Sequence, residues 1–138
     1  MNPKKIVLVD DSRTILETVG FALEPLVEAG VITYEPRLYP KEFLWDLLDG
    51  KTDFDLLISD INMPEMNGLE LIDIIKSEPA WYHKPILVLS TESSREMKEK
   101  GRKAGVVGWI VKPFDSARLR HVVRLILGIA TELDDPAS

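Results

Sequence analysis

Short apolar runs alternate with longer segments of helical periodicity, and this alternation restricts the possible folds more than any other feature. The runs at residues 6–9 and 54–59 are rich in β-branched and other apolar side chains, which is typical of strands buried on both faces. Each run is followed by a segment whose apolar residues recur every three or four positions. Strand and helix alternate five times, which predicts an α/β fold with a doubly wound parallel sheet and helices on both faces.

The boundaries of these elements can be predicted from local signals. Strands are expected at residues 6–9, 31–34, 54–59, 85–89 and 106–111, and helices after Ser12, over 40–49, from Asn67 to 75, over 95–104 and over 119–130. Ser12 and Asn67 are expected N-caps, and Asn67-x-x-Glu70 resembles a capping box. Because proline lacks the N–H that a helix interior needs, we expect the first helix to break or kink near Glu24, just before Pro25.

The second strand is expected at an edge of the sheet. It is short, and Glu35 and Pro36 follow it directly. Proline cannot donate to a strand ladder, and charged residues protect exposed edges from pairing with other chains.

Length and composition exclude several classes of protein. A chain of 138 residues fits one domain, with an ordered core over about residues 4–130 and a frayed tail over 131–138. The net charge of −6 argues against a nucleic-acid module, because phosphate binding requires a basic surface. The absence of cysteine excludes disulfides and thiolate metal sites. The N-terminal apolar run is too short for a signal peptide or a membrane span, so a cytoplasmic location is expected.

Polar side chains stand at the end of four predicted strands. Asp10 and Asp11 follow the first strand, Asp60 the third, Ser90 the fourth and Lys112 the fifth. The carboxyl ends of parallel strands share one edge of the sheet, which is where open α/β sheets bind their ligands. Three converging carboxylates repel one another, and a hard cation such as Mg²⁺ would relieve this. Together with a lysine and a hydroxyl group, they suit a phosphoryl group.

Asp60 is the candidate nucleophile of this site, because a carboxylate can form an acyl phosphate. The following segment contains Met63-Pro64 and Asn67-Gly68. We expect these pairs to turn the chain quickly away from Asp60 and leave its carboxylate open.

The motifs VDDS (9–12), ISDINMPEMNGLEL (58–71), PILVLSTES (85–93) and KAGVVGWIVKPF (103–114) form a recognisable combination. With these motifs and their spacing, the chain resembles a response-regulator receiver domain of the single-domain chemotaxis type over essentially its whole length. The resemblance implies a flavodoxin-like five-stranded sheet of order 2-1-3-4-5. It makes Asp60 the phospho-acceptor and implies that Mg²⁺ is held by Asp10, Asp11, Asp60 and the backbone carbonyl of Asn62.

The resemblance also implies a switch. Ser90 and Lys112 would bind oxygens of the phosphoryl group, and Ser90 and Trp109 would report its presence. Asn62 and Glu92 fall where the family tunes dephosphorylation, and the peptide bond from Lys112 to Pro113 would be cis. The alternative for Ser90 is a strand-end cap, and for Trp109 a half-buried aromatic residue.

The chain also departs from the family pattern. Pro25 and residues 35–41 take an unfamiliar form, which puts the first helix and its kinase-docking surface in question. Thr91 stands where a small alanine is common; its bulk could slow movement of this loop, or its hydroxyl could substitute for that of Ser90.

The expected function is that of a stand-alone response regulator. Its Mg²⁺-dependent phosphorylation by a histidine kinase or histidine phosphotransfer protein would switch a protein-binding face. We expect a monomer that binds neither DNA nor membrane, and no enzyme with a separate turnover substrate. Residues 94–124 carry nine Lys/Arg and three Asp/Glu, which favours an acidic partner on the fourth helix, fifth strand and fifth helix; two solvated helix faces are the alternative.

Three rival functions remain open. A phosphorelay intermediate would pass the phosphoryl group on to a histidine phosphotransfer protein. An aspartate-nucleophile phosphatase usually needs a second acid two residues after the nucleophile, where this chain has Asn62. A degenerate receiver would bind its partner without phosphorylation, although the acidic set is intact.

Overall fold

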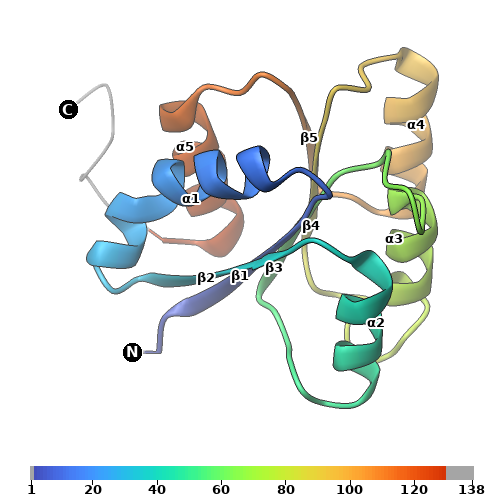
Figure 1. Ribbon diagram of the computed structural model, residues 1–138, viewed down its shortest axis with the longest axis horizontal. Coiled ribbons are helices and arrows are strands. Elements are labelled where there is room, and N and C mark those ends of the chain that lie inside the picture. The colour runs from blue at the N-terminus through green and yellow to red at the C-terminus, as the bar shows by residue number, and fades with distance from the viewer. Residues whose placement is uncertain (1, 130–138) are drawn as a thin grey trace.

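The computed structural model describes residues 2–129, which form a five-stranded parallel sheet with helices on both faces (Figure 1). The strand order is β2-β1-β3-β4-β5, as the resemblance implied. The strands are β1 (Lys4–Val9), β2 (Ile32–Arg37), β3 (Leu56–Ser59), β4 (Ile86–Ser90) and β5 (Gly108–Val111).

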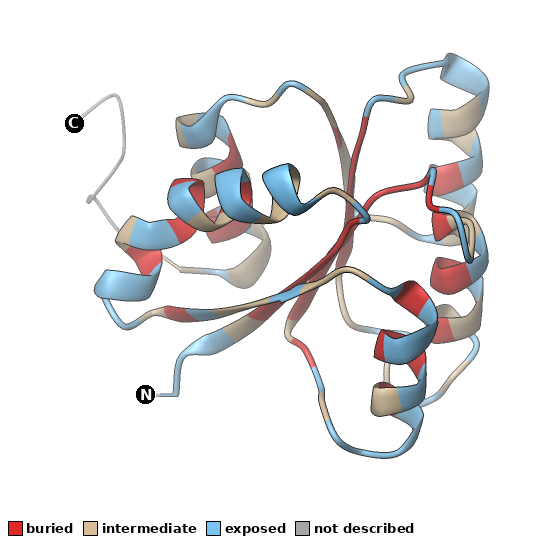
Figure 2. Cartoon of the chain, in the orientation of Figure 1, coloured by how far each residue is buried: buried red, intermediate tan, exposed pale blue. Residues whose placement is uncertain are grey.

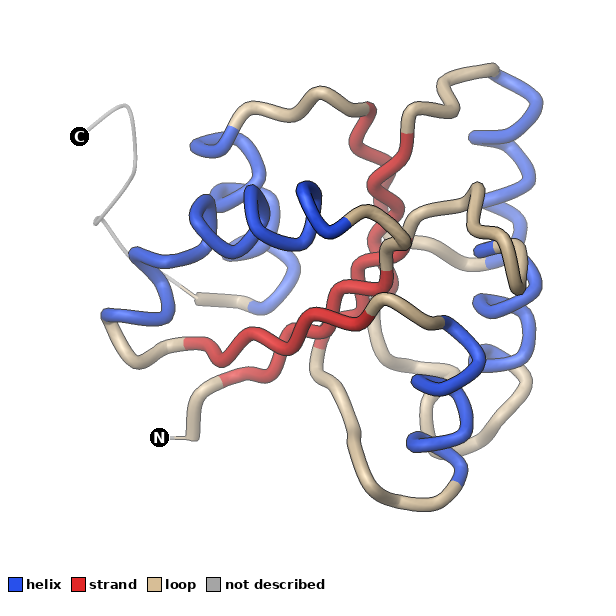
Figure 3. The backbone as a smooth tube through the Cα atoms, in the orientation of Figure 1, coloured by secondary structure: helices blue, strands red, loops and turns tan. Residues whose placement is uncertain are grey.

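Five helices connect the strands and cover the sheet. They are α1 (Arg13–Glu28), α2 (Pro40–Leu48), α3 (Gly68–Lys76), α4 (Arg95–Ala104) and α5 (Ser116–Leu127). Helices α1 and α5 cover one face of the sheet, and α2, α3 and α4 cover the other (Figure 3). Within the described residues, none of these helices has the length and apolar character needed to cross a bilayer.

The strands are buried on both faces because each face carries its own apolar layer. Ile6 and Leu8 of β1 pack toward α1 and α5, while Val7 and Val9 pack toward α2 and α3. Successive strand residues point to opposite faces, so a strand covered on both sides is continuously apolar. Figure 2 shows this as a buried stripe through the middle of the sheet.

Both predicted N-caps are confirmed. The Ser12 hydroxyl accepts a hydrogen bond from the N–H of Ile15, and the Asn67 side chain accepts one from Leu69. Among residues 2–129, the reciprocal bond from the Glu70 side chain that would complete a capping box is absent.

A break or a kink was predicted near Glu24; the break is wrong, because α1 continues through Pro25 to Glu28, and the kink stays a prediction. An internal proline removes one backbone hydrogen bond and crowds the preceding turn. On either side of it, Leu23 and Leu26 are completely buried against the sheet. Their burial opposes the loss, at about 1.5–3 kcal/mol for a leucine side chain.

The second strand lies at the sheet edge, as predicted, but is longer than expected. It runs to Arg37 and includes Pro36, which is tolerated because β2 pairs only with β1. Ion pairs fix the extension: Lys5 Nζ lies 2.9 Å from Glu35 Oε1, and the Arg37 guanidinium pairs with Asp46 of α2. Helix α5 begins at Ser116, three residues before the predicted start, and ends at Leu127 with Gly128 as its C-cap, so the predicted end at residue 130 is wrong.

Candidate functional site

The three predicted acids meet at the carboxyl edge of the sheet. Asp10 directly follows β1 and Asp60 directly follows the neighbouring strand β3, where the Asp60 N–H donates to the carbonyl of Val9 at 3.1 Å. One carboxylate oxygen from each of Asp10, Asp11 and Asp60 lies within 4.8 Å of the others. Asp10 is fully buried, Asp60 is 7% exposed and Asp11 is exposed, so the cluster opens to solvent on one side.

Backbone N–H groups orient the two buried carboxylates. The N–H of Ser12 donates to Asp10 Oδ1 at 2.9 Å, and the N–H of Ile61 donates to Asp60 Oδ1 at 2.6 Å. Sequence reasoning missed these contacts, since backbone groups carry no residue-type signal. They fix one oxygen of each acid and leave the Oδ2 atoms for other partners.

Lys112 joins the two buried acids, as its place after β5 predicted. Its Nζ lies 2.7 Å from Asp10 Oδ2 and 3.1 Å from Asp60 Oδ2. Its backbone N–H donates to the carbonyl of Ser90 at 2.9 Å, which ties it to the end of β4. The peptide bond between Lys112 and Pro113 is cis, as the resemblance implied.

Burial and charge act in opposite directions on these groups. Burial raises the pKa of the Asp10 carboxyl above its ordinary value, although hydrogen bonds from Lys112 and Ser12 oppose it. For Lys112, burial would lower the ammonium pKa, but the bonds to Asp10 and Asp60 outweigh it and the pKa is raised. The site therefore holds a firmly charged lysine and an aspartate whose charged form burial disfavours in spite of its contact with Lys112.

The donor set fits a hard divalent cation. Mg²⁺ prefers oxygen ligands, usually one or two carboxylates with water and phosphate oxygens completing an octahedron. Asp10, Asp11 and Asp60 offer three such oxygens in close proximity, and one side of the cluster is open to solvent. A bound cation would also favour the charged form of Asp10, which burial disfavours. Asn62, whose carbonyl was the fourth predicted ligand, lies on the exposed loop two residues after Asp60.

Ser90 and Trp109 both hydrogen-bond to the backbone of Glu92. Neither side chain contacts the acid cluster through a hydrogen bond among residues 2–129. Ser90 is fully buried at the end of β4, and its hydroxyl accepts a hydrogen bond from the Glu92 N–H at 3.2 Å. The Glu92 carbonyl accepts one from Trp109 Nε1 at 2.8 Å. Among residues 2–129, the Ser90 hydroxyl makes no hydrogen bond to the acids or to the Lys112 ammonium group. Both contacts hold Glu92, near the β4 end of the loop between β4 and α4, and Thr91 within this loop is exposed.

The segment after Asp60 does not lead away from it, which corrects our expectation. The N–H of Gly68 donates to the carbonyl of Ile61 at 2.8 Å, so the loop returns and α3 begins beside Asp60. A Cβ atom on Gly68 would lie 2.1 Å from the backbone oxygen of Asp60, closer than any real Cβ contact. The Asn67-Gly68 pair therefore permits close approach.

Comparisons with known proteins agree with this geometry. Residues 6–124 match the family model described as the response regulator receiver domain. The chain is 35% identical to the chemotaxis protein CheY1 of Helicobacter pylori, over 90% of this chain and 97% of that protein. It is 36% identical to a Campylobacter jejuni chemotaxis protein CheY homolog, over 90% of this chain and 92% of that protein.

Solved structures give the same result. The structure of the chemotaxis response regulator CheY4 of Vibrio cholerae superposes with a TM-score of 0.77 at 35% identity, covering 91% of this chain and 99% of that one. The BeF3-activated DrrB receiver domain gives a TM-score of 0.77 at 25% identity, covering 91% and 98%. With five polar side chains at the predicted strand ends and a family match over most of its length, this chain belongs to the response regulator receiver domain family.

Proposed function

We propose that this protein is a CheY-type response regulator in which Mg²⁺-dependent phosphorylation of Asp60 by a histidine kinase, or by a histidine phosphotransfer protein, changes the affinity of a protein-binding face. The observation that carries the proposal is the position of the Asp60 carboxylate, which belongs to the acid cluster and also contacts Lys112. By analogy with the chemotaxis proteins among its relatives, we place its output in chemotaxis-type signalling.

The proposed transfer is a displacement at phosphorus. A carboxylate oxygen of Asp60 attacks the phosphoryl group, the P–N bond to the donor histidine breaks, and the imidazole nitrogen leaves with the bonding electrons. Asp10, Asp11, Asp60 and the Asn62 carbonyl would hold a bound Mg²⁺. This ion would neutralise charge on the phosphoryl oxygens. The Lys112 ammonium group, already 3.1 Å from Asp60 Oδ2, pairs with one phosphoryl oxygen. Beyond its own phosphoryl group, the protein would turn over no substrate.

The proposed readout passes through the loop between β4 and α4. The Ser90 hydroxyl moves to a phosphoryl oxygen and gives up its bond with the Glu92 N–H, while the Trp109 indole leaves the Glu92 carbonyl and fills the space that Ser90 vacates. Helix α4 follows this loop, so the α4–β5–α5 face changes with it. Asn62 and Glu92 would set the lifetime of the phosphoryl group. The cytoplasmic location remains a prediction.

Magnesium should stabilise the folded protein through the acid cluster. At about one hundred times its dissociation constant, a ligand that binds only the native state adds roughly 2.7 kcal/mol to the free energy of unfolding. For a chain of this size we expect the midpoint temperature of thermal unfolding to rise by roughly 5–10 °C. Differential scanning fluorimetry with and without Mg²⁺ measures it. Asp11→Asn should lose most of the shift, whereas exposed Asp49→Asn should keep it; equal shifts in both variants would contradict the assigned ligands.

Beryllofluoride, a phosphoryl analogue, should change the fluorescence of Trp109. The indole now bonds to the Glu92 carbonyl and is half-buried, and in the proposed switch it moves inward, which shifts emission to shorter wavelength. The native protein, Trp109→Phe and Trp81→Phe are compared in the presence of Mg²⁺. The shift should vanish in Trp109→Phe and persist in Trp81→Phe. A shift that survives in Trp109→Phe would remove this residue from the switch without affecting the phosphorylation proposal.

Intact-mass analysis tests the proposed function itself. After incubation with acetyl phosphate and Mg²⁺, the native protein should gain the mass of one phosphoryl group, and removal of Mg²⁺ by a chelator should prevent this. Treatment with hydroxylamine should reverse the gain, because it cleaves acyl phosphates. A protein that gains no mass at any Mg²⁺ concentration is the degenerate receiver considered above. Return of the phosphoryl group to a histidine phosphotransfer protein would identify a relay intermediate.

A further inference from the structure

Helix α4 has a glycine at its one buried position. The buried residue of this helix is Gly101, whereas Met97 and Ala104 are half-buried and the other side chains are polar. Glycine is a poor helix former, because it loses more conformational freedom on folding than any other residue. Its place in the interior of α4 therefore indicates the close approach of a neighbouring group.

That neighbouring group is the indole of Trp109 on β5. A Cβ atom at Gly101 would lie 2.8 Å from Cζ3 and 3.0 Å from Cε3 of the indole, at or below the closest distance that real Cβ atoms show. A larger residue at position 101 would displace the ring or push α4 away from the sheet. The position of Trp109 in this structure therefore depends on the missing side chain of Gly101.

The other end of the indole reaches the loop that follows β4. Trp109 Nε1 donates to the Glu92 carbonyl at 2.8 Å, and the Glu92 N–H donates to the Ser90 hydroxyl at 3.2 Å. Trp109 is opposite Val88 in the register of β4 and β5. Residues two apart in a strand point to the same face, so Trp109 and Ser90 share the α4 face of the sheet. One ring thus connects α4 with the hydroxyl group that moves in the proposed switch.

We infer that Gly101 is a positioning residue for Trp109: it allows the indole to rest against α4 in the unmodified protein, and so holds the protein in the resting state until Asp60 is phosphorylated. The inference rests on the proposed function, in which the indole leaves this place and moves toward Ser90. Helix α4 then loses the aromatic contact at its one buried residue, which is how the movement of the ring reaches the α4 surface.

Gly101→Ala should tighten the binding of beryllofluoride about tenfold at saturating Mg²⁺. The added methyl group occupies the resting place of the ring, whereas the switched position is unaffected. Minor states of proteins are commonly populated at about 0.1–10%, and the apparent affinity of a ligand that selects such a state rises in proportion to its population. The dissociation constant is obtained from the midpoint of thermal unfolding as a function of beryllofluoride concentration.

The emission of Trp109 gives a second readout, which needs no ligand. In the unmodified Gly101→Ala protein it should move to shorter wavelength, toward the emission of the native protein with beryllofluoride. Trp109→Leu supplies the background emission of Trp45 and Trp81. It also removes both ring atoms that face Gly101, so adding Gly101→Ala to this variant should change the affinity for beryllofluoride by less than about twofold.

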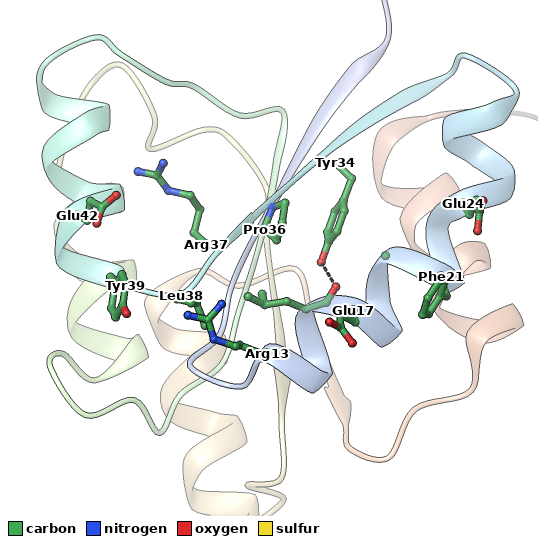
Figure 4. A pocket seen from close by; sticks show the side chains of 12 residues that line it. Arg13, Glu17, Phe21, Glu24, Tyr34, Pro36, Arg37, Leu38, Tyr39 and Glu42 are labelled. Carbon is green, nitrogen blue, oxygen red and sulfur yellow. Dashed lines mark hydrogen bonds between the residues drawn. The ribbon is translucent and has the colours of Figure 1, made fainter.

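Gly20→Ala is the matched control, because Gly20 is also a glycine inside a helix beneath an aromatic ring. A Cβ there would lie 3.2 Å from the ring of Tyr34, which lines a cavity of about 740 Å³ beside α1. The Tyr34 hydroxyl donates to the Leu16 carbonyl at 2.7 Å (Figure 4). Tyr34 packs on the face of the sheet opposite to Trp109. Gly20→Ala should therefore leave the affinity for beryllofluoride and the emission unchanged.

Three results would overturn the role of Gly101. They are native affinity and native emission in Gly101→Ala, emission at longer wavelength, which would place the ring in solvent, and an equal gain in affinity in the Trp109→Leu background, which would assign the effect to α4 alone. If the native protein binds no beryllofluoride and takes no label from acetyl phosphate, the proposed function fails. The emission of the unmodified variants then still decides whether Gly101 positions Trp109.

Discussion

Replacing Asp60 by asparagine should abolish phosphorylation, with a loss in rate on the order of 10³-fold or more, as for other nucleophile deletions. The amide keeps the shape of the side chain, and its oxygen can still accept the hydrogen bond from the Ile61 N–H. It has no negatively charged oxygen to attack phosphorus, so no acyl phosphate can form. Lys112 keeps its partner Asp10, which should hold the site together. Intact mass and radiolabel from acetyl phosphate give the rate.

Two further variants separate the loss of the nucleophile from a general effect of charge. Asp49→Asn removes one exposed carboxylate outside the site and should leave the rate of labelling unchanged. Asp11→Asn removes a proposed Mg²⁺ ligand but not the acceptor, so labelling should slow and require more Mg²⁺. If Asp60→Asn still acquires a hydroxylamine-sensitive phosphoryl group at the native rate, another carboxylate is the acceptor and the assignment of Asp60 is wrong.

Replacing Gly68 by alanine should destabilise the protein by about 3 kcal/mol, at the upper end of what overpacking usually costs. The added methyl group would lie 2.1 Å from the Asp60 carbonyl oxygen and 2.8 Å from the Ile61 Cα. Both neighbours are backbone atoms, so relief requires movement of the loop or of the start of α3. Urea denaturation monitored by circular dichroism measures the change, and the phosphorylation rate should fall with it because the loop carries the neighbours of Asp60.

Gly20→Ala is the matched control for Gly68→Ala. Gly20 lies inside α1, where alanine gains up to about 1 kcal/mol of helix propensity, whereas Gly68 is the first residue of α3. The Cβ at position 20 would lie 3.2 Å from a Tyr34 ring atom, a side chain that can shift slightly. We expect the free energy of unfolding to change by about 1 kcal/mol or less. Similar losses in both variants would mean that the contact with the Asp60 backbone has no special cost.

The chemistry-bearing residues could be predicted because topology fixes where strand ends lie. Once alternation indicates a parallel sheet, Asp10, Asp60 and Lys112 must share one edge, although they are distant in sequence. Their contacts at 2.7 and 3.1 Å confirm this. The edge position of β2 could also be predicted, since Pro36 is compatible only with a strand that pairs on one side.

Other features depend on tertiary packing that a local pattern does not record. Pro25 has the same local cost in any helix, and only the burial of Leu23 and Leu26 explains why α1 continues through it. The glycine at position 68 signals a turn, but whether the chain leaves or returns depends on what lies beside it. The role of Glu92 is carried by its backbone N–H and carbonyl groups, which are the same in every residue except proline.

The single ammonium group shared by Asp10 and Asp60 has a thermodynamic consequence. A phosphoryl group on Asp60 would carry roughly −1.5 to −2 charges in place of the single charge of the carboxylate, and Lys112 cannot be fully directed to it while compensating Asp10 as well. A divalent ion bound by the acids would make up this deficit, so the two ligands should show positive cooperativity. By thermodynamic reciprocity, if the bound ion favours the phosphorylated state by some factor, phosphorylation raises the affinity for the ion by the same factor. The ambient concentration of free Mg²⁺ would thereby set how much of the activated form persists.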